Sequence, residues 1–395
     1  MKKLSLLIIA SLIVSTPTST AALKQISVKS LTPLITIAPI SEVSGVLANG
    51  LQLIIFGNRE DQAYVRAIDS AGEEQWSAAL SPELDSIATA GAVDSAGNIW
   101  IAGSASLERV NPTPVDPLVP INPDGVDGTK EAIANNLDAV VLWKIPTGTS
   151  IPLTYTNQQE SAVLVNAIAL DNVGISLVGV RATDKGSSGF LLSADSSGIF
   201  TALIKVGSQT TELSSVIRYR DGSKMLIGSS SESLGGKKLI GLADGVIIRV
   251  DSQSVVTKVV RSSEIKANRS WSVASSSLLL GGSVIKDSKI QSAVTKFSSS
   301  LAPQWTSRFD STGTTFTSGA NRALFASTST IASLRGWAPK SSRPLLLTFD
   351  TKGLISEAYS APVKHNEVFG LIESKELGLL VLTTNGEVVS AFQAK

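Results

Sequence analysis

Short apolar runs that close on a small residue recur along the chain and give it an internal repeat. The copies are IIFG at 54–57, WIAG at 100–103, LVG at 177–179, LIG at 226–228, LLLG at 278–281 and LFA at 324–326. Their last residues are about 46, 76, 49, 53 and 45 residues apart, so one step contains an insertion. A repeat of this length predicts a series of similar supersecondary units.

A second pattern follows each run: an alternating apolar and polar strand that ends in a turn. The copies are AYVRAIDSAG from 63, VVLWKIPTG from 140, GFLLSADSSG from 189, GVIIRVDSQS from 245, SAVTKFSSSL from 292 and PLLLTFDTKG from 344. Alternation at period two is typical of half-buried β-strands. The turns repeat an aspartate, at Asp69, Asp94, Asp171, Asp195, Asp221, Asp251 and Asp350. Because Asp bonds its own backbone two residues on, we interpret these aspartates as turn residues and not as paired catalytic carboxylates.

The repeat unit contains four strands, and no long segment shows helical periodicity. Units start near residues 43, 84, 162, 211, 265, 313 and 363, and the last holds only three strands. We therefore expect an all-β protein, a β-propeller of about seven four-stranded blades. The alternating strand at 24–34 is expected to supply the fourth strand of the last blade and close the ring. Six or eight blades also fit, because the final unit is the weakest.

Two segments carry a resemblance to known propeller repeats. AVDSAGNIWIAGS at 92–104 resembles the bacterial SBBP-type repeat, and AYVRAIDSAGEEQW at 63–76 is similar to the quinoprotein-like (PQQ-type) repeat. Trp76 and Trp305 occupy equivalent positions in two units. The resemblance implies the fold and leaves function open, since such repeats encode blade geometry.

The first residues have the pattern of an export signal. Lys2 and Lys3 precede an apolar run at 4–14, and small residues follow at Ser19, Ala21 and Ala22. The run is shorter than the roughly 20 residues that span a bilayer. We expect a signal peptide at 1–22 and one propeller domain at 23–395. The protein would then be secreted, periplasmic or at the cell surface, without a membrane span.

Composition narrows the function classes. The chain has no cysteine, which excludes thiol catalysis and cysteine metal sites. It has 34 basic and 33 acidic residues, which argues against nucleic acid as a partner. A hydrophobic fraction of 43% argues against disorder. We expect a monomer.

Catalytic motifs are not evident. The one histidine, His365, is interpreted as a surface or inter-blade residue, since no G-x-S-x-G, H-E-x-x-H or Walker sequence accompanies it. A quinone cofactor is not expected either: the family's vicinal cysteine pair is absent, and packing explains the repeated tryptophans. We expect no cofactor. The alternative is a propeller hydrolase or quinone-dependent oxidoreductase with its site at the channel mouth.

The insertion at about 104–136 is rich in proline and aspartate. Its NPTPVDPLVPINPDGVDGT sequence predicts a long loop, because proline disrupts sheet pairing. Asp124 and Asp127 with nearby carbonyls are candidate ligands for calcium, and their spacing does not match an EF-hand.

The longer connections are expected on one face, opposite the short Asp turns. Basic residues gather on them with few acids besides Glu232, and Trp337 lies among them. The candidate ligand-binding residues are Arg181, Lys185, Lys237, Lys238, Lys286, Lys289, Arg335, Trp337, Lys340 and Arg343. We expect a basic rim that binds an anionic polymer or a protein surface, with Trp337 as a stacking contact. The predicted function is an exported, non-catalytic binding or scaffold module for a protein or glycan at or outside the cell envelope.

Overall fold

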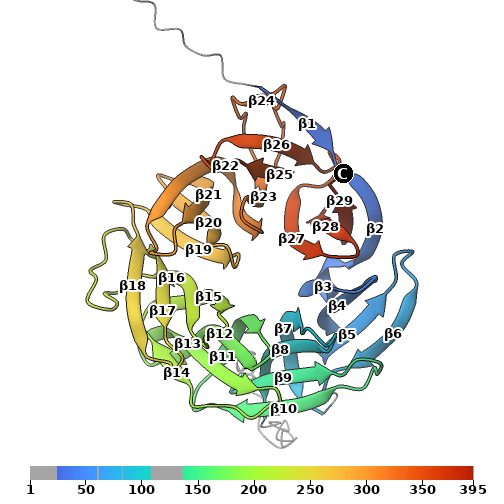
Figure 1. The fold of residues 1–395 in the computed structure, drawn as a ribbon, viewed down its shortest axis with the longest axis vertical. Helices are drawn as coiled ribbons and strands as arrows, with labels where there is room; N and C mark the ends of the chain where they lie inside the picture. The colour runs from blue at the N-terminus through green and yellow to red at the C-terminus, as the bar shows by residue number, and fades with distance from the viewer. Residues whose placement is uncertain (1–24, 60–61, 82, 108–136, 395) are drawn as a thin grey trace, which may run out of the picture.

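The structure is a computed structural model that describes residues 25–59, 62–81, 83–107 and 137–394. The chain forms a β-propeller in which seven antiparallel blades can be followed within these residues (Figure 1). The expected signal peptide and most of the insertion, including Asp124 and Asp127, lie outside the described residues. The predicted unit starts lie within four residues of the observed first strands.

Each blade has four strands, of which the first lies innermost (Figure 1). Blades 1 and 2 are β3 (Gly45–Asn49), β4 (Gln52–Arg59), β5 (Gln62–Ile68), β6 (Glu74–Ala79), then β7 (Asp85–Val93), β8 (Ile99–Ser106), β9 (Ala139–Ile145) and β10 (Leu153–Gln158). Blades 3 and 4 are β11 (Val163–Leu170), β12 (Gly174–Thr183), β13 (Gly186–Asp195), β14 (Ile204–Val206), then β15 (Thr211–Arg218), β16 (Lys224–Ser230), β17 (Asp244–Val250) and β18 (Val256–Ser262).

The last three blades depart slightly from this regular order. Blades 5 and 6 share β22 (Pro303–Ser318), whose first half pairs with β21 and whose second half pairs with β23. Their other strands are β19 (Asn268–Ala274), β20 (Leu279–Lys286), β21 (Lys289–Phe297), then β23 (Arg322–Ser327), β25 (Arg343–Phe349) and β26 (Ile355–Ser360). Blade 7 is β27 (Glu367–Ser374), β28 (Gly378–Thr384), β29 (Val388–Gln393) and β2 (Thr32–Pro39), and the short 3-10 helix η1 (Ile40–Glu42) leads from β2 towards blade 1.

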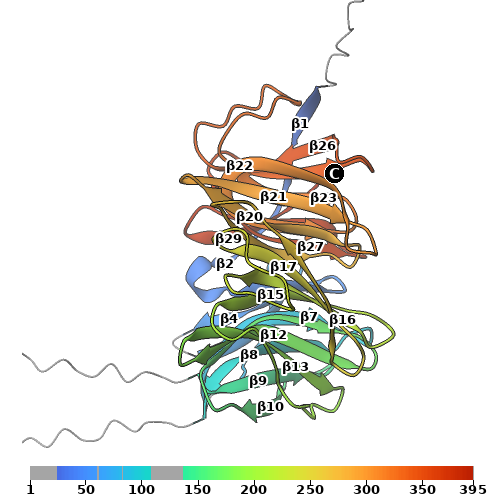
Figure 2. The same cartoon turned by 90° about the vertical axis from the view of Figure 1, so that its left-hand side faces the viewer.

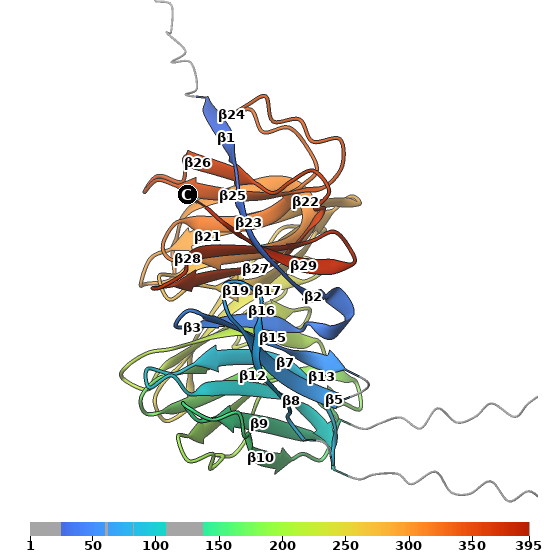
Figure 3. The ribbon, with the colours of Figure 1, turned by 90° about the vertical axis from the view of Figure 1, so that its right-hand side faces the viewer.

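The N-terminal segment completes blade 7, as predicted, but with different bounds. β2 pairs antiparallel with β29 from Thr32 to Pro39. The preceding β1 (Ile26–Ser30) instead lies parallel to β26 of blade 6 and contacts the short β24 (Leu334–Arg335). Figure 3 shows β1 and β2 as one ribbon that crosses from blade 6 to blade 7. Leu31, between the two strands, is buried in the core of these blades. The N-terminal segment therefore pairs with two blades, 6 and 7, and not with blade 7 alone.

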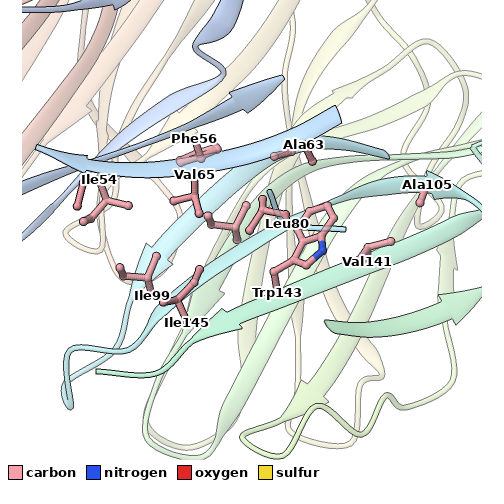
Figure 4. Close-up of a cluster of buried hydrophobic side chains, with 13 residues drawn as sticks. Ile54, Phe56, Ala63, Val65, Leu80, Ile99, Ala105, Val141, Trp143 and Ile145 are labelled. Carbon is pink, nitrogen blue, oxygen red and sulfur yellow. The ribbon is translucent and has the colours of Figure 1, made fainter. Parts of the chain in front are cut away.

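Apolar side chains pack between neighbouring blades and form the core. Figure 4 shows one such cluster, which contains Ile54 and Val65 of blade 1 together with Ile99 and Trp143 of blade 2. The Trp143 indole donates a hydrogen bond of 2.7 Å to the Ser81 hydroxyl, which satisfies its buried N–H. A comparable cluster joins blade 7 to blade 1, with Leu382 packed near Leu53. Inter-blade packing thus continues around the ring.

The glycine that closes most of the apolar runs has a steric role. A Cβ on Gly57, Gly103, Gly179, Gly228 or Gly282 would lie 1.8–2.0 Å from a backbone carbonyl oxygen. In blades 2 to 5 the innermost strand has a β-bulge opposite this glycine, which brings the carbonyl close. In blade 5 the position belongs to Gly282, one residue later than the predicted end of the run.

The repeated aspartates are turn residues, as predicted. All seven accept at least one backbone N–H bond from two to four residues further on, at 2.8–2.9 Å. Several of these turns place a glycine at positive φ, such as Gly97 at 81°. Their carboxylates are therefore engaged in local structure.

Candidate functional site

The connections between second and third strands lie on one face, which we call the long-loop face. In an up-and-down blade, the turns after the first and third strands lie at one end, and the remaining connections lie at the other. The disc therefore has two different faces, and Figure 2 shows it from the edge. The predicted basic residues all fall on the long connections or on strand ends beside them. The predicted placement on one face is correct.

Much of the predicted basic rim is paired with acids. Arg181 contacts Glu160 at 3.1 Å, Lys286 contacts Glu264 at 3.0 Å, and Lys289 contacts Asp310 at 3.3 Å. Arg181 is also only 7% exposed. The expectation of few acids on this face is wrong, because acids from the blade-to-blade links and outer strands meet these cations.

Trp337 is not a surface stacking residue. Its side chain is 6% exposed and packs in the cluster between blades 5 and 6. Its indole donates a hydrogen bond of 3.2 Å to Ser327, and the Arg343 guanidinium lies 5.4 Å from the ring centroid. Arg343 in turn bonds the Ala361 carbonyl at 3.0 Å. Core packing explains the tryptophan, so the role predicted for it is corrected.

Five of the predicted cations remain exposed and have no carboxylate partner within the described residues. They are Lys185, Lys237, Lys238, Arg335 and Lys340. Lys237 and Lys238 lie side by side on the connection at 231–243 of blade 4 and line a groove. Lys185 comes from blade 3, and Arg335 and Lys340 both come from the connection at 328–342 of blade 6. Lys185, Arg335 and Lys340 do not join them.

The groove lies between this connection and β18, the outer strand of blade 4. Its volume is about 740 Å³. Val256 and Ile240 contribute apolar surface that is 42% and 61% exposed. Lys258 and Arg261 also line it. The groove therefore combines apolar surface with several cations, a combination that suits an acidic partner.

Arg261 is held by a buried acid at the inner end of the groove. Its Nε lies 2.9 Å from Asp244, whose side chain is inaccessible to solvent. The two remaining guanidinium nitrogens donate to the carbonyls of Glu232 and Ser230. Arg261 therefore fixes the start of the 231–243 connection, and the charge that faces the groove comes mainly from the lysines.

Glu232 anchors the same start of the connection to the link that enters from blade 3. Its carboxylate accepts bonds from the Ser208 backbone N–H at 2.8 Å and hydroxyl at 2.7 Å, and from the Thr211 hydroxyl at 2.7 Å. The backbone N–H groups of Gln209 and Thr210 add two more. Partial burial raises the pKa of Glu232, but these hydrogen bonds outweigh it and lower the pKa to about 2. The sequence analysis named Glu232 as an acid on this face, but it did not predict its partners in the link from blade 3.

His365 lies on the link from blade 6 to blade 7 and is buried against blade 7, so it is not the surface residue that was one of the two roles predicted for it. It is 3% exposed, its Nδ1 lies 2.9 Å from the Thr383 hydroxyl, and its ring meets Phe392 edge-on. Burial, with a contribution from Lys364, lowers its pKa. A neutral, buried histidine of this kind serves packing.

Residues on the innermost strands link each blade to the next. The bulge residues Thr89, Asn166 and Ser272 donate side-chain hydrogen bonds to backbone carbonyls of the following blade, at 2.7, 2.9 and 3.4 Å. These three side chains near the ring axis are therefore engaged in structure.

Metal-ligating residues do not gather in the part of the chain that the structure describes. No group of three or more His, Asp or Glu side chains there could hold an ion. The calcium candidates Asp124 and Asp127 lie outside it and stay a prediction. Among the described residues, no helix has the length and apolar character needed to cross a membrane.

Comparison with known proteins identifies the fold and no more. No family model and no curated protein matches the sequence. The WD40 domain of coronin from Toxoplasma gondii is similar in structure, with a TM-score of 0.52 and 11% identity over 93% of this chain and 88% of that one. An ulvan lyase of polysaccharide lyase family PL25 has a TM-score of 0.50 and 10% identity, over 93% of this chain and 95% of that one. These similarities support a β-propeller fold. They do not show whether the repeats are of the SBBP type or of the PQQ type.

Proposed function

We propose that this protein is an exported binding module whose long-loop face holds an acidic protein or glycan. The observation that carries the proposal is the groove on blade 4. It places Lys237 and Lys238, which have no carboxylate partner in the part of the chain that the structure describes, beside exposed apolar surface. The partner would be extracytoplasmic, as the N-terminal sequence predicts.

Preorganisation of the groove supports this role. Glu232 bonds the link from blade 3, and Arg261 bonds Asp244 and the carbonyls of Ser230 and Glu232, so both sides of the 231–243 connection are tethered. A surface that is fixed before binding loses less conformational entropy when the partner arrives. The lysines at its edge would attract an anionic partner over a distance and make its association sensitive to salt.

The enzyme alternative has less support. A WD40 domain and a lyase are both structurally similar to this chain, so the fold is compatible with either class. Near the ring axis, however, Thr89, Asn166 and Ser272 bond the next blade instead of converging on a shared point. This arrangement favours a binding role.

A binding measurement at two salt concentrations tests the proposal. The full mature chain would be immobilised and exposed to polyglutamate, sulfated and carboxylated polysaccharides and neutral polysaccharides. We expect salt-sensitive binding to acidic polymers. Lys237→Ser with Lys238→Ser should weaken it at least about tenfold, because two cations leave the groove.

A second double variant is the matched control. Lys185→Ser with Lys340→Ser removes the same charge from the same face but away from the groove, and binding should change by less than about twofold. Equal losses in both double variants would contradict a specific groove and indicate a general effect of net charge. Absence of binding to every acidic polymer would refute the proposed partner class.

A further inference from the structure

Arg269, on the innermost strand of blade 5, is a buried cation that has no hydrogen-bond acceptor within the described residues. It is 8% exposed, and its Nε is fully buried without a partner. Its guanidinium lies 4.6 Å from the Trp271 ring centroid. Burial, together with the charge of Arg308, lowers its pKa to about 10, although the charges of Glu264 and Asp244 act in the opposite direction. A guanidinium in this environment is destabilising unless an anion compensates it.

The strand register places Arg269 beside a pocket at the junction of blades 4 and 5. Arg269 is opposite Val284, Val284 is opposite Gln291, and all three point to one face of the sheet. Lys286 and Arg308 lie on the same face by the alternation of side chains. A pocket of about 410 Å³ is lined by Val284, Lys286, Gln291 and Arg308 together with the 287–289 turn and Glu264.

This face of the sheet also packs against blade 4. The Arg269 backbone N–H donates to the Ala243 carbonyl at 2.9 Å, and Trp271 lies against Gly245. The nearest buried acid on blade 4, Asp244, is already paired with Arg261 at 2.9 Å. Blade 4 therefore supplies no free carboxylate to Arg269.

The acids around the pocket do not balance its cations. Lys286, Lys289 and Arg308 line the pocket with Glu264 and Asp287, and Asp310 pairs with Lys289. Arg269 is not part of the lining, but it lies opposite Val284, which is, and it adds a fourth cation to these three acids. Glu264 is shared between Lys286 at 3.0 Å and Arg308 at 2.5 Å, and Asp310 holds Lys289. Asp287 is exposed at the turn. One positive charge is in excess, and the buried one without an acceptor is Arg269.

We propose that this pocket binds a singly charged oxyanion group, a carboxylate or a sulfate ester, with Arg269 and Arg308 as the donors. A planar guanidinium matches the paired oxygens of either group, and a single negative charge balances the excess. The inference rests on the proposed function only for the source of the anion, which would be an acidic group of the bound partner. The small anions themselves can be tested alone.

Thermal unfolding of the full mature chain tests the pocket directly. Sodium acetate and sodium methyl sulfate would be titrated at low millimolar concentration against sodium chloride of equal ionic strength. We expect a saturable rise in Tm of about 2 °C at ten times Kd for the group that fits. Isothermal titration calorimetry on the same samples gives the affinity, and the two salts distinguish carboxylate from sulfate ester.

Variants separate this site from a structural role of Arg269. Arg269→Met should abolish the response while leaving the anion-free Tm equal or higher, because it removes an uncompensated buried charge. Arg269→Lys should weaken the affinity at least about tenfold, since it loses the planar pair of donors. Arg308→Gln removes the second donor and should also reduce the anion response, so it tests the site even if Arg269→Met does not fold. The control Lys340→Met lies away from the pocket and should respond to the anions like the parent.

The results also separate this inference from the proposed function. The proposed anion site would be refuted by an unchanged anion response in Arg269→Met or Arg308→Gln, or by the lack of a saturable response in the parent chain. Binding of acidic polymers without binding of either small anion would do the same and leave the groove on blade 4 as the working surface. Binding of a small anion without any acidic polymer would support the pocket and contradict the proposed function.

Discussion

Replacement of Glu232 by Gln should destabilise the protein at neutral pH and remove a pH dependence at low pH. The carboxylate accepts five hydrogen bonds from residues 208–211, and its pKa of about 2 compares with an ordinary value of 4.5. A difference of about 2.5 pKa units corresponds to roughly 3 kcal/mol of preference for the charged form. Because Glu232 is partly exposed, solvent screening reduces this to about 2 kcal/mol.

The sign of the pH dependence follows from the lowered pKa. The unfolded chain binds a proton at Glu232 near pH 4.5, whereas the folded chain does so only near pH 2. The stabilisation is therefore complete above pH 4.5 and is lost as the pH falls towards 2. Glu232→Gln carries no titrating group there, so the difference in unfolding free energy between parent and variant should shrink over this range.

Urea unfolding at pH 7, 5, 4 and 3 measures this difference. Glu387→Gln, an exposed carboxylate on the same face whose side chain has no recorded partner among the described residues, is the matched control and should change stability by less than about 0.5 kcal/mol. A Glu232→Gln difference below about 0.5 kcal/mol at pH 7, or one that stays constant down to pH 3, would refute the reasoning. Weaker binding of acidic polymers by this variant would further show that the anchor positions Lys237 and Lys238.

Three other substitutions test the fold. The parent should lose stability as the pH falls below about 6.5, because the lowered pKa of buried His365 means that the unfolded chain binds the proton at a higher pH than the folded chain. His365→Gln should reduce this loss, and thermal unfolding at several pH values measures it. Ser254→Gly should stabilise by about 0.5–1 kcal/mol in urea unfolding, because Ser254 has a φ of 69°, whereas Ser252→Gly, outside this conformation, should not. Gly103→Ala should destabilise the protein by about 3 kcal/mol or more, because its Cβ would lie 1.8 Å from a carbonyl oxygen. The control Gly370→Ala would meet only a flexible leucine at 3.1 Å and should lose about 1 kcal/mol, so a similar loss in both variants would contradict the steric explanation.

Local chemistry made the blades predictable. The Asp turns depend on hydrogen bonds between residues two to four apart, such as Asp94 to Ala96, so a short stretch of sequence contains both partners. The closing glycines repeat because each blade brings a carbonyl to the same point. These features recur at fixed spacing, and they gave the number of units and their starts.

Pairing between distant residues was not predictable in the same way. Lys286 meets Glu264, and Arg322 meets Glu373 51 positions away, through the packing of neighbouring blades. Trp337 is buried because the 328–342 connection folds back on blades 5 and 6. In a sequence with nearly equal numbers of acids and bases, no local signal shows which cations will remain without a partner.

Arg269 illustrates how function can be sought in such a fold. Arg269 stands two residues before the bulge of its innermost strand. The equivalent position holds Ser86 in blade 2 and Val163 in blade 3, so the repeat does not call for an arginine there. Its burial beside Trp271 without an acceptor is not required by blade geometry, since an apolar residue would fill that place at lower cost. A bound anion would compensate this charge, and the anion titration decides whether one binds.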